Sequence, residues 1–201
     1  NTVVNENGKL MGYNTDGTGY MRAVKEAGFS IKGEKMTLLG AGGAATSILV
    51  QAALDGVREI SVFCRPGKST EHARQVTKQT ACKINLFDYS DESVIKKELL
   101  TSRILTNGTN VGMAPDTDRS LITSADFFHP DLIVSDVIYN PRETKLMGIA
   151  KSQGCSCFNG LYMLLYQGAE AFTLWTGKQM PVELVKERYF DEPEARLRTA
   201  Q

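Results

Sequence analysis

Short apolar runs alternate with stretches of helical composition along most of the chain. The apolar runs, typical of buried strands, fall at residues 35–39, 59–64, 83–87, 103–107, 132–137 and 155–158. The helical stretches between them fall at residues 44–54, 70–79, 91–100 and 144–153. Strands that alternate with helices are joined by right-handed crossovers and build a parallel sheet. We therefore predict an α/β fold with a doubly wound parallel sheet and helices on both of its faces.

The two ends of the chain follow different patterns. Two short apolar runs, at 2–4 and 10–13, flank the pair Asn7-Gly8, which strongly favours a tight hairpin turn. Because two strands alone are only marginally stable, we expect the other strands of their sheet to lie upstream of residue 1. Further helices are predicted at 18–27, 162–176 and 182–189, and the polar residues 191–201 are expected to form a flexible tail.

Composition limits the classes of protein that fit this pattern. Hydrophobic residues make up 42% and charged residues 23% of the 201 positions, which is typical of a globular protein. Lys plus Arg and Asp plus Glu both number 23, and this balance argues against general binding to nucleic-acid backbones. Since apolar runs are too short to span a bilayer, and four cysteines make no disulfide scaffold, we expect a cytoplasmic protein without a membrane partner.

A glycine-rich turn joins the strand at 35–39 to the helix at 44–54. It follows the pattern Gly-x-Gly-x-x-Ala, in which Gly40 permits the sharp turn and Gly42 lets the backbone approach a pyrophosphate. The small Ala45 lets the helix pack closely on the strand, and the helix N-terminus favours negative charge. No Gly-Lys-Ser/Thr follows, so a triphosphatase loop does not fit. We predict a Rossmann-like dinucleotide site at Gly40, Ala41, Gly42, Gly43 and Ala44. The alternative is a tight turn without a ligand.

The residues after the second strand bear on the choice of dinucleotide. NAD sites usually place an Asp or Glu there to hold the ribose diol. This chain has no carboxylate in that segment and carries Arg65 and Lys68 instead, which suit a 2′-phosphate. We therefore favour NADP, with NAD as a possible substitute; the alternative is a solvated loop with two ordinary basic residues.

Several further motifs, in this order and spacing, resemble the shikimate dehydrogenase family, including its quinate/shikimate branch. They are Asn14-Thr15-Asp16-Gly17, the Gly40 turn, Asn107-Gly108-Thr109-Asn110-Val111-Gly112-Met113, Asp136-Val137-Ile138-Tyr139-Asn140-Pro141 and the stretch from Gly160 to Ala169. The resemblance extends from Asn1 to about Tyr189, and Leu174-Trp175-Thr176-Gly177-Lys178 looks most like the quinate/shikimate branch.

The resemblance implies roles for particular residues. Asp16 matches the aspartate that pairs with a catalytic lysine beside the reacting hydroxyl. Asn1 and Gln167 match residues that hold the ring hydroxyls of the substrate, and Tyr139 matches a tyrosine near its carboxylate. Residues matching the cofactor groove are Asn107, Thr109, Val137, Gly160 and Met163. The family's catalytic lysine and its Ser-rich carboxylate-binding motif would lie upstream of residue 1.

The resemblance also implies how the chain is divided. We expect 1–13 to be the remnant hairpin of an upstream substrate-binding domain and 14–32 a linking helix. A dinucleotide-binding domain at 33–160 would follow, with C-terminal helices at 161–190 closing onto the cleft and a tail at 191–201. The implied state is a monomer or a homodimer acting on a small molecule.

The implied reaction is the reversible NADP-dependent reduction of 3-dehydroshikimate to shikimate, in which Asp16 and the lysine handle the proton without a metal. Alternatives are a quinate/shikimate enzyme using NAD or NADP, another NAD(P)-linked dehydrogenase such as one for amino acids or methylenetetrahydrofolate, and a non-catalytic dinucleotide-binding module. Taken alone, Asp16 also fits a helix N-cap. No metal site is expected, because Cys155 and Cys157 have no histidine nearby.

Overall fold

The computed structural model describes residues 1–65, 71, 75 and 78–190. The helix predicted at 70–79 falls largely outside these residues, and Lys68 and the segment 191–201 fall wholly outside them.

Six parallel strands form the central sheet, in the order β5-β4-β3-β6-β7-β8, and confirm the predicted fold class. The strands are β3 (Lys35–Leu39), β4 (Glu59–Phe63), β5 (Lys83–Phe87), β6 (Ile104–Asn107), β7 (Ile133–Asp136) and β8 (Ser156–Phe158). The order runs outward in both directions from β3 and β6. In such sheets the ligand crevice lies beyond the carboxyl ends of the strands at this switch point.

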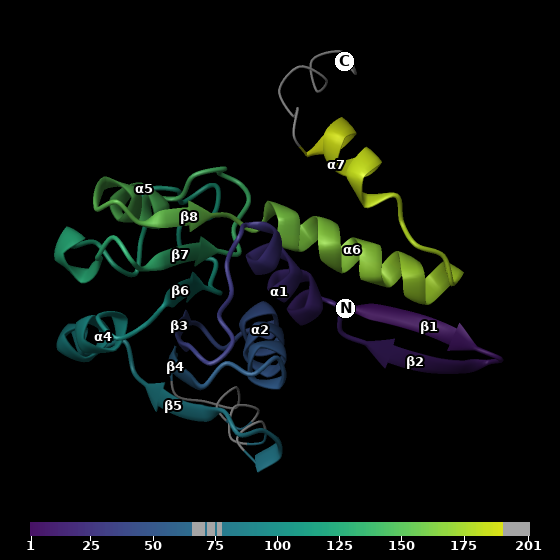
Figure 1. Ribbon diagram of the computed structural model, residues 1–201, viewed down its shortest axis with the longest axis horizontal. Coiled ribbons are helices and arrows are strands. Elements are labelled where there is room, and N and C mark those ends of the chain that lie inside the picture. The colour runs from purple at the N-terminus through teal and green to yellow at the C-terminus, as the bar shows by residue number, and fades with distance from the viewer. Residues whose placement is uncertain (66–70, 72–74, 76–77, 191–201) are drawn as a thin grey trace.

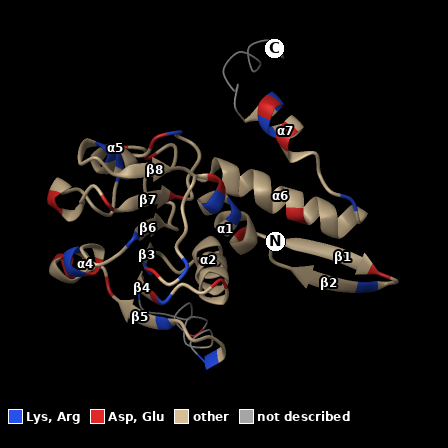
Figure 2. Ribbon diagram, viewed as in Figure 1, with Lys and Arg blue, Asp and Glu red and all other residues tan. Residues whose placement is uncertain are grey.

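Helices cover both faces of the sheet (Figure 1). One face carries α1 (Asp16–Glu26), α2 (Gly43–Leu54) and α6 (Leu161–Thr176), and the other carries α4 (Glu92–Leu99), α5 (Lys145–Ser152) and the short 3-10 helix η1 (Ala125–Phe127). The helix α7 (Val182–Tyr189) follows α6 and has no buried residue. Basic and acidic residues share the same elements, for example α4 and α7 (Figure 2).

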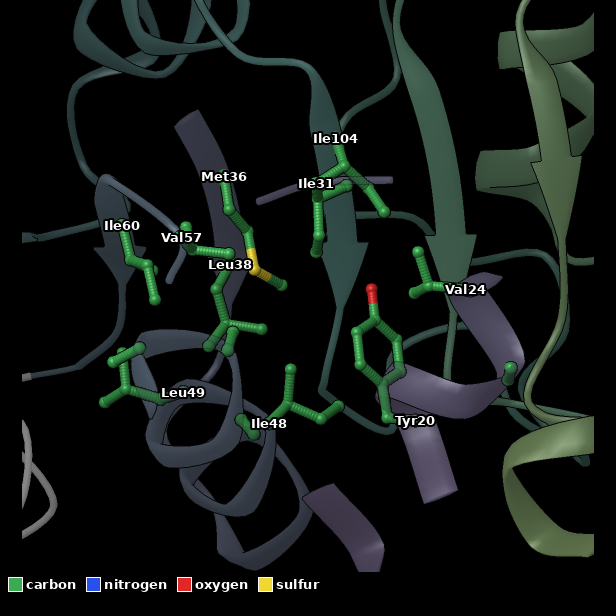
Figure 3. Packing of buried hydrophobic residues seen from close by; sticks show 14 of the residues in the cluster. Tyr20, Val24, Ile31, Met36, Leu38, Ile48, Leu49, Val57, Ile60 and Ile104 are labelled. Carbon is green, nitrogen blue, oxygen red and sulfur yellow. The ribbon is translucent and has the colours of Figure 1, made fainter. Parts of the chain in front are cut away.

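Two apolar clusters pack on the two faces because successive strand side chains alternate between them. Leu38 belongs to the cluster beneath α1 and α2, whereas Leu39 belongs to the cluster beneath α4 and α5. Tyr20 of α1 and Ile48 of α2 point into the first cluster beside Leu38 (Figure 3). All five residues of β3 are buried, as expected for a strand covered on both sides.

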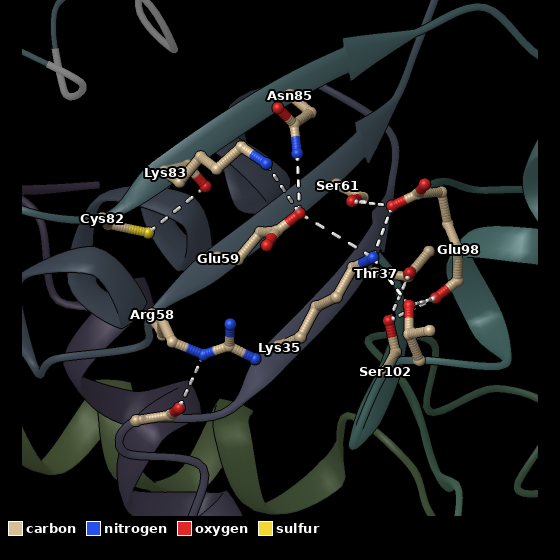
Figure 4. A network of polar contacts seen from close by, with 12 residues as sticks. Lys35, Thr37, Arg58, Glu59, Ser61, Cys82, Lys83, Asn85, Glu98 and Ser102 are labelled. Atoms are coloured by element: carbon tan, nitrogen blue, oxygen red, sulfur yellow. Dashed lines mark hydrogen bonds and ion pairs between the residues drawn. The ribbon is translucent and has the colours of Figure 1, made fainter.

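A polar network lies at the end of the sheet where the strands begin, opposite to the carboxyl ends of the strands (Figure 4). The ammonium group of Lys35 is buried at the start of β3 and lies 2.6 Å from a carboxylate oxygen of Glu98 on α4. Ser61 donates a hydrogen bond to the same carboxylate at 2.6 Å. Burial acts to raise the pKa of Glu98, but its contacts with Lys35 and Ser61 outweigh burial and hold the pKa below its usual value. The network therefore fixes α4 to the sheet far from the carboxyl ends of the strands.

The N-terminal hairpin forms as predicted. Strand β1 (Thr2–Glu6) pairs antiparallel with β2 (Lys9–Tyr13), and Asn7 and Gly8 both take positive φ, as a tight primed turn requires. The indole N–H of Trp175 donates to the carbonyl of Val3 at 3.0 Å and joins the hairpin to α6. The hairpin projects away from the six-stranded sheet beside α6 (Figure 1).

Two glycines let α1 pack closely between α2 and α6. A Cβ atom at Gly17 would lie 2.4 Å from the backbone oxygen of Ser47 on α2. A Cβ atom at Gly19 would lie 2.6 Å from the backbone nitrogen of Gln167 on α6. Since real Cβ atoms do not approach backbone atoms this closely, both helix contacts depend on glycine.

Replacing Gly19 with alanine should lower the free energy of unfolding by about 1–3 kcal/mol, because the added methyl group forces α1 away from α6. Gly168 on α6 offers a matched control, since a Cβ atom there would meet nothing within 4 Å. Gly168→Ala should leave the stability unchanged or raise it by about 0.5–1 kcal/mol through helix propensity. Urea unfolding measures the change in the free energy of unfolding for both variants. Equal changes in Gly19→Ala and Gly168→Ala would contradict the packing argument.

Candidate functional site

The glycine-rich turn lies at the switch point of the sheet and leaves the start of α2 open. Gly40 has φ +104°, and its N–H donates to the carbonyl of Phe63 at 2.8 Å. Gly42 occupies the N-cap position of α2 without a side-chain cap, and a Cβ atom there or at Gly43 would meet nothing within 4 Å. The first N–H groups of the helix are thus available to an anionic ligand that approaches the backbone.

Ala45 meets the packing role predicted for it. It is fully buried, and a Cβ atom at Gly108 would lie 2.8 Å from its methyl group. The loop after β6 therefore packs directly on the first turn of α2. This contact requires small residues on both sides.

Two neighbouring pockets form one cleft across the carboxyl ends of the strands. The wide pocket, about 780 Å³, is lined by Gly40, Ala41, Gly42, Arg65 and other residues. The narrow pocket, about 480 Å³, is lined by Gly43, Ala44, Val137, Tyr139 and other residues. Gly108, Thr109 and Asn110 line both, so the loop after β6 separates them. All five residues predicted for the glycine-rich turn therefore face the cleft.

The wide pocket contains basic and aromatic groups that sequence reasoning missed. Arg65 was predicted, but Arg119 and Tyr89 line the same pocket. Burial raises the pKa of the Tyr89 hydroxyl to about 12, so this group stays neutral at ordinary pH. Tyr89 lies two residues beyond β5, at the same edge of the sheet as the glycine-rich turn, and this position is the signal that could have identified it. Arg119 comes from a long irregular loop, for which the sequence gives no such signal.

The ends of β6 and β7 carry a buried polar pair beside the cleft. Asn107 and Asp136 are register partners, 2% and 1% exposed, and the Asn107 amide nitrogen lies 3.1 Å and 3.2 Å from the two carboxylate oxygens of Asp136. Asp136 also accepts hydrogen bonds from the Ile138 N–H and the Thr144 hydroxyl. Burial outweighs these hydrogen bonds and raises the pKa of Asp136 to about 6.

Three of the predicted substrate residues meet at the start of α1. The Asn1 amide nitrogen lies 2.7 Å from a carboxylate oxygen of Asp16 and 3.1 Å from the amide oxygen of Gln167. It also donates to the hydroxyl of Thr15 at 2.9 Å. Hairpin, α1 and α6 thus each contribute one polar side chain to a small cluster. Tyr139 is not hydrogen-bonded to these residues in the described part of the chain and lies instead on the narrow pocket.

Asp16 is not the cap of α1. The N-cap position belongs to Thr15, and the side-chain oxygen of Asn14 accepts the Asp16 N–H at 3.1 Å. The Asp16 carboxylate instead accepts a hydrogen bond from the Asn1 amide. The capping interpretation is wrong. The amide of Asn14 also donates to Ser47 on α2 at 2.8 Å and ties this cluster to the helix behind the glycine-rich turn.

The remaining predicted cofactor residues differ in their placement. Gly160 is the N-cap of α6, and a Cβ atom there would lie 1.9 Å from the carbonyl oxygen of Val137, which lines the narrow pocket. Met163 is buried in the core cluster, with 8% of its surface exposed. Lys68 lies outside the described residues. Among the residues described, no group of three His, Cys, Asp or Glu could hold a metal ion, and no helix has the length and apolar character to cross a membrane.

The residues that line the cleft fit a dinucleotide. The uncapped start of α2 suits a pyrophosphate, and Arg65 suits a phosphate on the ribose. The narrow pocket, bounded by Val137 and Tyr139, offers a less basic surface for a planar ring. The polar cluster at Asn1, Asp16 and Gln167 supplies amide and carboxylate groups of the kind that bind hydroxyls.

Comparisons with known proteins identify the relatives of this chain. Residues 160–188 match the family model for the shikimate 5′-dehydrogenase C-terminal domain. The chain is 53% identical over 194 residues to a shikimate dehydrogenase (NADP(+)) of Listeria monocytogenes serotype 4b (strain F2365), covering 94% of this chain and 67% of that protein. It is 48% identical over 191 residues to a quinate/shikimate dehydrogenase of Escherichia coli O139:H28, covering 93% of this chain and 66% of that one.

A solved structure shows the same fold. The crystal structure of shikimate 5-dehydrogenase from Listeria monocytogenes with shikimate and NAD matches with a TM-score of 0.88 at 53% identity, over 92% of this chain and 65% of that chain. The present chain thus spans about two thirds of the length of these relatives. On the identity, the coverage and the shared fold, the chain belongs to the shikimate dehydrogenase family.

Proposed function

We propose that this chain forms the dinucleotide-binding part and one side of the active site of an NADP-dependent shikimate dehydrogenase. The reaction is the reversible reduction of 3-dehydroshikimate to shikimate, carried out in the cytoplasm on a small soluble substrate. The observation that carries the proposal is the convergence of Asn1, Asp16 and Gln167 at the start of α1, on a chain whose glycine-rich turn opens onto a cleft.

The three clustered side chains have the chemistry to hold a polyol. In the structure they satisfy one another, with the Asn1 amide shared between Asp16 and Gln167. Ring hydroxyls of a substrate can replace these contacts one for one, because each hydroxyl both donates and accepts. Asn1 and Gln167 then orient the ring, and the Asp16 carboxylate faces the reacting oxygen.

Asp16 and a partner lysine handle the proton of the reaction. NADPH held in the cleft would supply the hydride to the carbonyl carbon of 3-dehydroshikimate, so the protein must provide the proton that the carbonyl oxygen takes up. A lysine paired with Asp16, as the family resemblance implies, delivers that proton and needs no metal. The role of Asp16 is to hold the lysine as a charged donor beside the oxygen and to stabilise its positive charge.

Support for NADP over NAD comes from the wide pocket. NAD sites use a carboxylate after the second strand, whereas here Arg65 follows β4 directly after Cys64. Arg119 lines the same pocket from the opposite loop and adds a second positive charge. Both charges favour the 2′-phosphate that distinguishes NADP from NAD.

Arg65→Ser should weaken NADPH binding about 10- to 100-fold by removing a charge-assisted contact with the 2′-phosphate, and should leave NADH binding unchanged. Fluorescence titration of the nicotinamide measures both. Arg188→Ser on α7 removes the same charge away from the cleft and should change neither affinity. Tighter binding of NADH than NADPH by the unsubstituted chain would overturn the assignment of NADP, and so would an equal loss of both in Arg65→Ser.

Asp16→Asn should lower the rate of shikimate oxidation about 100-fold or more, because the amide cannot stabilise the charged lysine. The measurement uses a protein in which this chain follows the N-terminal third of its Listeria relative. The NADPH affinity should stay the same, since Asp16 lies outside the cleft residues. Glu26→Gln makes the same chemical change at the far end of α1 and serves as the control. Full activity in Asp16→Asn would contradict the role assigned to it.

A further inference from the structure

The carboxylate of Asp136 is a buried charge that no step of the proposed reaction uses. It lies at the end of β7, and three donors from three segments point at it. They are the Asn107 amide, the Ile138 N–H at 3.0 Å and the Thr144 hydroxyl at 2.8 Å. A carboxylate buried in this way is costly unless its hydrogen bonds are made, so its presence beside the cleft requires an explanation.

Asp136 sets the direction of the hydrogen bonds around it. An ionised carboxylate can only accept, so Asn107 must turn its amide nitrogen toward Asp136. The amide oxygen of Asn107 then faces Thr109, where it accepts the backbone N–H at 3.1 Å and the hydroxyl at 2.7 Å. Since the Thr109 hydroxyl donates to Asn107, its oxygen is left to accept the Val111 N–H at 3.1 Å. Asp136 thus stands at one end of a series of three steps, from Asn107 to Thr109 to Val111, and the Asn107 amide nitrogen also donates to the Val111 carbonyl at 3.3 Å.

This chain of hydrogen bonds ends on the walls of the cleft. Thr109 lines both pockets, and a Cβ atom at Gly40 would lie 2.8 Å from its methyl carbon. The loop after β6 is therefore held against the glycine-rich turn in one position. Ile138, bonded to Asp136 directly, lines the narrow pocket from the other side.

The same carboxylate also orients the helix that follows β7. The Thr144 hydroxyl donates to Asp136, and its oxygen accepts the Met147 N–H at 3.4 Å as the N-cap of α5. Both ends of the segment 136–144 are therefore attached to one side chain. That segment carries Val137, predicted to line the cofactor groove, and Tyr139, predicted to lie near the substrate carboxylate.

We propose that Asp136 is a positioning residue that holds the two loops of the dinucleotide cleft in their binding shape through Asn107 and Thr109. The proposal rests on the proposed function of the cleft. It differs from a purely structural role, in which the carboxylate would support only its own strand and α5.

Exchanging the two side chains tests the proposal. Asp136→Asn leaves three donors facing one acceptor oxygen, so the hydrogen bonds around residue 136 no longer have a fixed direction. Asn107→Asp combined with Asp136→Asn restores the direction at Thr109 and Ile138: the new carboxylate at 107 accepts from Thr109 and from the new amide at 136, whose oxygen still accepts from Ile138. The hydrogen bond from residue 107 to the Val111 carbonyl is lost in this variant. The exchange preserves both composition and charge. Ser135→Ala, one residue earlier in the same buried strand, is the control.

The expected results separate a positioning role from a structural one. At pH 8, where the carboxylate is ionised, Asp136→Asn should weaken NADPH binding about tenfold. The double variant should return to within about threefold of the original affinity, and Ser135→Ala should not change it. Amide hydrogen exchange should quicken at Thr109, Val111 and Ile138 in Asp136→Asn and recover in the double variant.

Two outcomes would overturn the proposal. The first is faster exchange at Ile138 alone, with Thr109 and Val111 unaffected, because the carboxylate would then act only within its own segment. The second is a double variant no better than Asp136→Asn in both measurements. If the unsubstituted chain binds neither NADPH nor NADH, the proposed function fails, and the exchange rates at Thr109 and Val111 still decide whether Asp136 orders the loop.

Discussion

The close approach of α1 to both of its neighbouring helices is the constraint on which the polar cluster depends. Gly17 brings α1 against α2, and Gly19 brings it against α6. Only at this separation does Asn14 reach Ser47 and does Asn1 reach Gln167. The candidate substrate groups are short side chains, so their meeting point is set by the distances between helices rather than by rotamer choice.

The candidate dinucleotide cleft is held together in another way. Its walls are loops that leave neighbouring strands, and polar contacts at the strand ends fix them where apolar packing cannot. Helix α6 joins the two parts of the site. Its N-cap, Gly160, packs against the carbonyl of Val137, and the helix carries Gln167 further along the same rigid element. A displacement of α6 would therefore affect both sides of the site together.

Sequence patterns predicted the parts of this molecule that local chemistry determines. The apolar runs identified the strands, the Asn7-Gly8 pair the hairpin, and the glycine-rich turn the start of α2. Contacts between distant segments were not accessible in this way. Gly17 and Gly19 look like poor helix residues until α2 and α6 are placed beside them, and Arg119 reaches the cleft through a loop without a regular pattern. The direction of hydrogen bonds around Asp136 likewise appears only once β6 and β7 are paired.

The junction between the hairpin and α6 contains an intrinsic fluorescent probe. The chain contains a single tryptophan, Trp175, which is 60% exposed and bonded through its indole nitrogen to Val3 in β1. Its emission depends on the local environment of that indole. Tryptophan fluorescence from this protein therefore reports on the contact between the hairpin and α6.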